Sequence, residues 1–188
     1  TVGVAPGAKV MLLLGYNTQG AVFESSQYAI LMGANVISAS LSFKQSNCSD
    51  PGWRDCPNYV AHRWVSEMEL AAGIIHANST GNDGLLNPVP LSVPAPANSP
   101  PPAMTPSHEQ QGGVSSMVAV AAYFQGGAFQ TSSGRGPSGW SREDICVHPR
   151  SPFCGLPGAP DEYPAEFEDY PYHNAEFPGL AKPDITAQ

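Results

Sequence analysis

Short apolar runs alternate with segments of helical periodicity along residues 10–122. Four runs are short enough for strands of a buried sheet, and they span residues 10–14, 36–39, 74–77 and 117–122. Val10–Leu14 is continuously apolar, which is typical of a strand covered on both faces. Strands that alternate with helices indicate an α/β domain with a parallel sheet and right-handed crossovers.

Two helices are predicted between these strands. The first spans residues 21–32 and stops at Gly33, because glycine commonly follows the end of a helix. Asn58 can cap the second, which ends before Gly73. The apolar residues at helical spacing are Val22, Ala29 and Ile30 in the first helix, and Val60, Trp64 and Met68 in the second.

Two long segments interrupt the pattern within what the chain length predicts to be one domain. Residues 87–113 are rich in Pro, Ser and Ala, and are expected to run as an extended surface loop. Residues 138–179 form a second loop-rich insertion, and its acidic part could bind Ca²⁺, although a solvated acidic loop is the default interpretation. The acidic and aromatic residues there are Asp161, Glu162, Tyr163, Glu166, Glu168, Asp169, Tyr170, Tyr172 and Glu176.

The charge and hydropathy of the chain exclude two classes of partner. The net charge is -8 with only 8 Lys and Arg residues, so binding to a nucleic-acid phosphate backbone is not expected. No apolar run approaches the roughly 20 residues that span a bilayer, so no membrane span is predicted.

The cysteines form two local pairs, Cys48 with Cys56 and Cys146 with Cys154. Structural zinc sites usually have shorter Cys spacings, so zinc is disfavoured. Two short loops that are each closed by a disulfide fit better and indicate an oxidising, extracytoplasmic compartment. Four free buried thiols in a cytoplasmic protein are the alternative.

The segment Ser79–Gly84 follows the apolar run 73–77 and places Asn82 in a glycine-flanked turn. In open α/β sheets the carboxyl ends of the strands bind ligands and transition states. An asparagine amide there can donate to a developing oxyanion without a proton transfer. A plain tight turn is the simpler interpretation of this pair alone.

Five segments in this order resemble the subtilisin-like serine peptidases, or subtilases. They are residues 3–10, 35–42, 79–84, 131–137 and 182–187. The resemblance covers nearly the whole chain. It implies a three-layer α/β fold with a mostly parallel sheet flanked by helices. It also implies a secreted, monomeric endopeptidase that forms an acyl-enzyme with peptide or protein substrates, needs no cofactor for its chemistry and can carry structural Ca²⁺.

The resemblance also assigns roles to individual residues. Asn82 is the expected oxyanion-hole amide. The segment Ser40, Leu41 and Ser42 is the expected strand edge that pairs with an extended substrate, although the family has Gly where this chain has Ser42. Ser79, Thr80 and Gly81 are expected to form one wall of the primary specificity pocket, with Asp83 at its rim.

A complete catalytic triad is not expected within these residues. The Asp and His segments of the family would lie before Thr1 and the Ser segment after Gln188, so we expect an internal, inactive fragment whose fold is incomplete at both ends. His76 lies in an apolar strand and is interpreted as a hydrogen-bonded core residue. His62 falls on the second predicted helix. The others, His108, His148 and His173, fall in loops, and the chain has no G-x-S-x-G motif.

Two further hypotheses come from other classes of protein. A pseudopeptidase could keep the cleft and bind peptides without cleaving them. A nucleotide-binding α/β domain would need a glycine-rich loop after the first strand, but residues 14–20 fit neither the dinucleotide nor the P-loop pattern.

Overall fold

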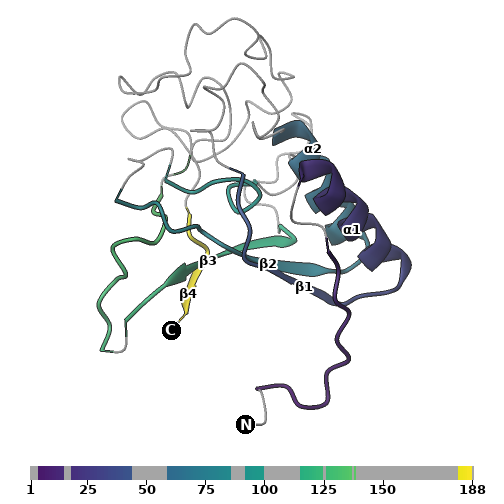
Figure 1. The fold of residues 1–188 in the computed structure, drawn as a ribbon, viewed down its shortest axis with the longest axis horizontal. Coiled ribbons are helices and arrows are strands. Elements are labelled where there is room, and N and C mark those ends of the chain that lie inside the picture. The colour runs from purple at the N-terminus through teal and green to yellow at the C-terminus, as the bar shows by residue number, and fades with distance from the viewer. Residues whose placement is uncertain are drawn as a thin grey trace, which may run out of the picture.

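The computed structural model describes residues 4–14, 18–43, 59–85, 92–99, 115–124, 126–136, 138 and 182–187. Its four strands form one parallel sheet in the order β1-β2-β3-β4 (Figure 1). The expected α/β class and parallel sheet are therefore confirmed. The elements are α1 (Gln19–Leu31), β1 (Val36–Ala39), α2 (Tyr59–Ala71), β2 (Ile75–Ser79), β3 (Met117–Ala122) and β4 (Ile185–Ala187).

Local sequence signals set most of the element boundaries. The hydroxyl of Thr18 accepts from the Ala21 backbone N–H at 3.1 Å and caps α1, and Gly33 adopts a φ of 71° after the helix ends. Strands β1 and β3 match the predicted runs, and β2 begins one residue after its predicted start. The proposed capping residue Asn58 lies outside the described residues.

The two helices lie side by side on the same side of the sheet, and α2 contacts β2 (Figure 1). Neither of the helices that the structure describes is long and apolar enough to cross a membrane.

The prediction of a strand over Val10–Leu14 is wrong. These residues are assigned to no strand, and Val10, Leu12 and Leu14 are exposed by 89%, 84% and 83%. An apolar run becomes a buried strand only where a neighbour supplies the ladder of backbone hydrogen bonds. Among the described strands, β1 is an edge of the sheet and does not pair with this run.

The prediction that residues 87–113 run over the surface is wrong for residues 92–99, although no helix or strand is assigned there. All eight residues from Ser92 to Ser99 are buried. Val93 and Ala97 pack with Ala119 of β3 to form a small apolar cluster. The composition of the segment is typical of loops, but Pro, Ala and Ser are also small enough to pack closely against a sheet. The rest of this segment lies outside the described residues.

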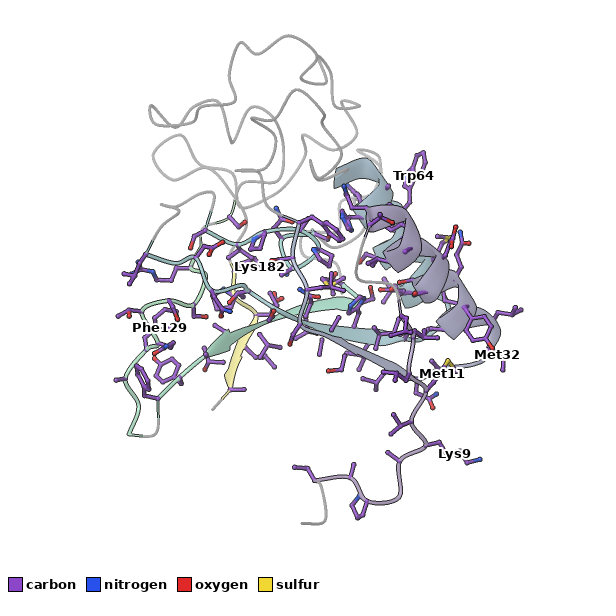
Figure 2. All side chains as sticks on the ribbon, in the orientation of Figure 1. Lys9, Met11, Met32, Trp64, Phe129 and Lys182 are labelled. Carbon is purple, nitrogen blue, oxygen red and sulfur yellow. The ribbon has the colours of Figure 1, made fainter. Side chains whose placement is uncertain are left out.

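Helix α2 turns a polar face toward the sheet. Trp64 is 59% exposed and points away from the sheet, and Met68 is also exposed (Figure 2). The apolar spacing therefore predicted the helix correctly but does not mark its buried face. The side chains buried on the other face are mostly polar, namely His62, Arg63, Val65, Ser66 and Glu69.

Candidate active site: the ends of strands β1 and β2

The two segments predicted to form the site leave adjacent strands at the same edge of the sheet. Parallel pairing of β1 with β2 ends at Ala39 and Asn78. Ser40–Ser42 follow β1, and Thr80–Asp83 follow β2, so the sheet brings the predicted substrate strand beside the predicted oxyanion turn. Gly81 has a φ of 78°, which glycine adopts without strain, and Asn82 after it is exposed.

The turn that carries Asn82 is held by a second turn, residues 131–136. The Gly84 backbone N–H donates to the Ser132 carbonyl at 2.8 Å, and Gly134 donates to the Gly81 carbonyl at 3.3 Å. Arg135 Nη2 donates to the Gly84 carbonyl at 2.9 Å. Backbone groups on both sides of Asn82 are thus fixed, which is the preorganisation that an oxyanion-binding amide needs.

Close backbone approach explains the glycines of these two turns. A Cβ atom on Gly134 would meet the carbonyl oxygens of Thr80 and Ser92, and one on Gly84 would meet the backbone of Ser133. A hydroxyl pair adds to this contact, because Thr80 Oγ1 lies 3.0 Å from Ser133 Oγ. Thr80 is therefore buried as a support of the turn.

The remaining pocket residues differ in exposure. Ser79 and Gly81 are half-buried, and Asp83 is half-buried beside Asn82. Ser40 is exposed, while Leu41 and Ser42 are half-buried. The structure thus brings all eight predicted site residues to one edge of the sheet and leaves Asn82 and Ser40 accessible.

Segment 40–43 is held from one side. The Leu41 carbonyl accepts from Asn78 Nδ2 at 3.1 Å, and the Phe43 N–H donates to the Ala95 carbonyl at 2.8 Å. Phe43 and Ala95 form an isolated antiparallel bridge. The buried segment 92–99 therefore forms part of the scaffold of the predicted substrate strand.

The last motif, residues 182–187, anchors β4 beside β3. Asp184 Oδ2 accepts from the Ala119 backbone N–H at 2.6 Å and from Lys182 Nζ at 2.6 Å. Burial lowers the pKa of Lys182, while the neighbouring Asp184 carboxylate acts in the opposite direction. Lys182 lies at the start of this motif (Figure 2), and a Cβ on Gly136 would meet its backbone.

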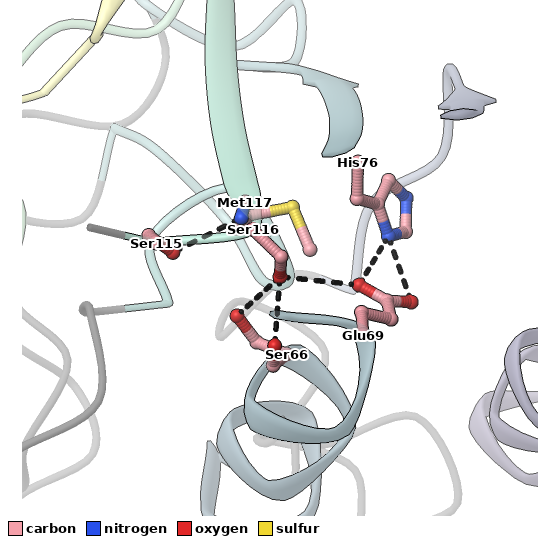
Figure 3. A network of polar contacts seen from close by, with 6 residues as sticks. All are labelled: Ser66, Glu69, His76, Ser115, Ser116 and Met117. Atoms are coloured by element: carbon pink, nitrogen blue, oxygen red, sulfur yellow. Dashed lines mark hydrogen bonds and ion pairs between the residues drawn. The ribbon is translucent and has the colours of Figure 1, made fainter. Parts of the chain in front are cut away.

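His76 is a core residue, as predicted. Its Nδ1 lies 3.1 Å from both carboxylate oxygens of Glu69, and both side chains are buried. Ser116 Oγ donates to the Ser66 carbonyl at 2.8 Å and contacts Glu69 at 3.4 Å (Figure 3). The serine contacts the carboxylate rather than the imidazole, and no described residue is a hydrogen-bond partner of His76 Nε2. Among the described residues this group is not a Ser-His-acid triad.

His62 of α2 is buried against α1. Its Nε2 donates to Gln19 Oε1 at 3.1 Å, and its ring lies 4.9 Å from that of Phe23 and 5.5 Å from that of Phe43. Burial, with a smaller contribution from His76, lowers the pKa of His62 from 6.5 to about 3.

We expect His62 to make the fold sensitive to acid. Because its folded-state pKa is below the unfolded value, its contribution is fully present above about pH 6.5 and is lost as the pH falls toward 3. As the pH falls through this window, the unfolding free energy of the unaltered protein should decrease more steeply than that of His62→Gln. Urea unfolding of both proteins across the window measures the difference, and parallel curves would contradict the lowered pKa.

No group of three or more His, Cys, Asp or Glu side chains that could hold a metal occurs within the described ranges. The predicted disulfides Cys48–Cys56 and Cys146–Cys154 lie outside those ranges. So do the acidic residues 161–176 and the loop histidines His108, His148 and His173.

Comparison with known protein families places the chain. The model of the subtilase family matches residues 1–187. The chain belongs to the subtilase family. A search of curated protein sequences gave no significant match. The resemblance drawn from the five sequence segments is therefore confirmed. The subtilases are serine peptidases, so proteins are the class of substrate that the family indicates.

Three supporting residues of this subtilase site were not predicted. Asn78 holds the Leu41 carbonyl, and Ser133 and Arg135 hold the oxyanion turn. Asn78 had a signal in the sequence, because it lies two residues after His76 and therefore shares its face of a strand. The other two belong to residues 131–137, whose motif indicated the family without indicating this role.

Proposed function

We propose that the full-length protein is a secreted serine endopeptidase in which Asn82 donates a hydrogen bond to the oxyanion of the acyl-transfer transition state. The observation that carries this proposal is the position of Asn82. It lies exposed at the carboxyl end of β2, in a turn held on both sides by backbone hydrogen bonds, in a chain of the subtilase family. Such a fixed amide stabilises developing negative charge without reorganising.

The proposed cleavage follows the general course of covalent peptide hydrolysis. A serine attacks the scissile carbonyl with a histidine as general base, and the carbonyl oxygen becomes an oxyanion. Asn82 and a backbone N–H hold that oxygen. Ser40–Ser42 pair with the extended substrate, and Ser79, Thr80, Gly81 and Asp83 border the pocket for its primary side chain.

A direct test uses the full-length protein. It should hydrolyse fluorogenic peptides and become labelled at one serine by a fluorophosphonate, whereas residues 1–188 alone should do neither. Labelling of a serine within residues 1–188 would contradict the assignment. Peptide binding without cleavage or labelling would instead support the second candidate, a peptide-binding pseudopeptidase.

The secreted location rests on the two cysteine pairs. We propose disulfides Cys48–Cys56 and Cys146–Cys154, which non-reducing peptide mapping would detect. Four alkylatable thiols in the native protein would contradict both the pairing and the location. The proposed chemistry requires no cofactor. A structural Ca²⁺ site is a further proposal, for which a chelator should lower the unfolding temperature.

A further inference from the structure

The backbone pairing of β1 with β2 stops before the predicted substrate strand, residues 40–42. Beyond that point, the side chain of Asn78 links β2 to this segment. The last residue pair is Ala39 with Asn78. Leu41 lies two residues beyond, and the Asn78 side chain reaches its carbonyl, with Nδ2 at 3.1 Å. The same Nδ2 donates to the Ser79 carbonyl at 2.9 Å. One amide group therefore connects the ends of both strands.

Asn78 holds this position at an energetic cost. The residue is 1% exposed, and its Oδ1 has no hydrogen-bond partner among the residues that the structure describes. A buried polar atom without a partner is unfavourable, and an apolar residue would avoid that cost. The two donated hydrogen bonds offset it, so the donor group accounts for the amide at this position.

Asn78 binds one edge of segment 40–42, so the backbone groups on the opposite edge of this segment remain accessible to a substrate. In an extended strand, the backbone polar groups of successive residues face opposite edges. We call the edge of segment 35–43 that faces β2 and segment 92–99 its inner edge. The Asn35 carbonyl accepts from Ile75 there, and the Leu41 carbonyl accepts from Asn78. The Phe43 N–H donates to Ala95 on the same edge. The backbone groups of Ser40 and Ser42 consequently face the outer edge, where an added peptide strand can pair with them.

We propose that Asn78 is a positioning residue that holds Leu41 so that Ser40 and Ser42 present their backbone groups to the substrate. This inference rests on the proposed peptidase function. Without the amide, the Leu41 carbonyl loses this hydrogen bond, and segment 40–42 can rotate about its axis. Asn78 contacts no reacting atom, so its effect should grow with the length of substrate paired to this segment.

The test compares substrates of different length in the full-length enzyme. For Asn78→Ala, kcat/KM for an extended peptide amide should fall about tenfold, mainly through KM, because one or two backbone hydrogen bonds are lost. A single-residue ester, which does not reach segment 40–42, should change less than about twofold. Equal losses for both substrates would overturn the proposal.

Ser116→Ala is the matched control. Ser116 is also buried but contacts Ser66 and Glu69 rather than segment 40–42. It should lower stability without distinguishing the two substrates, and a length-dependent loss in this variant would count against Asn78. If Asn78→Ala does not fold, Asn78→Ser, whose shorter side chain does not reach Leu41, replaces it.

Two measurements separate this proposal from the proposed function. If the unaltered enzyme cleaves neither substrate, the peptidase function fails. Calorimetric binding of the extended peptide then tests Asn78, with an expected tenfold weaker affinity for the variant and refutation if both affinities are equal. In the unaltered protein, the side-chain amide protons of Asn78 should exchange slowly with solvent, and rapid exchange would refute the hydrogen bonds themselves.

Discussion

Replacement of Asn82 by alanine in the full-length enzyme is expected to lower kcat by about 10²–10³, or about 2.7–4 kcal/mol, with little change in KM. Loss of one oxyanion-hole donor in subtilisin, a member of the same family, has an effect of this size. The effect should fall on kcat because the hydrogen bond strengthens only as charge develops on the oxygen.

Two further variants sharpen this test. Leu85→Ala alters an exposed residue just after the same turn and should leave kcat unchanged. Asn82→Asp keeps the shape of the side chain but replaces the donor with a carboxylate that repels the oxyanion, so its loss should exceed that of alanine. A loss carried mainly by KM in Asn82→Ala would show that Asn82 binds substrate in its ground state or only supports the turn.

The second large effect is expected in the buried pair of Glu69 and His76. Glu69 is 0% exposed and His76 is 3% exposed. His76→Val leaves the carboxylate buried without its partner and should lower the unfolding free energy by about 3–5 kcal/mol. The double variant Glu69→Met/His76→Val removes both polar groups and should be close to the unaltered protein in stability, because an apolar pair of similar size incurs no desolvation cost.

Denaturant unfolding of Glu69→Met, His76→Val and the double variant measures the coupling between the two side chains. Met68→Ala is the control on the exposed side of α2 and should change the unfolding free energy by less than about 1 kcal/mol. If the double variant loses as much unfolding free energy as Glu69→Met and His76→Val together, the pair is not coupled, and the two residues stabilise the fold through their other contacts.

Much of the fold and the site was predictable from local sequence. The helices, β1, β2 and β3 follow from periodicity and from glycines at helix ends, because these signals act within a few residues. The turn around Asn82 follows from glycine and asparagine after a buried strand. Strand β4 was not predicted, since three residues are too few for a periodic signal.

Only the tertiary structure decided which segments are buried and which residues support the site. Residues 92–99 have the composition of a loop but lie against β3, while the apolar run Val10–Leu14 is exposed. The contacts that position the site join residues far apart in the chain, such as Asn78 with Leu41 and Thr80 with Ser133. Periodicity reports on neighbours within one element, whereas burial and hydrogen bonding depend on which elements the sheet brings together. The sequence therefore determined the elements and the chemistry proposed for Asn82, and the parallel pairing of β1, β2 and β3 determined how the turn that carries Asn82 is held in place.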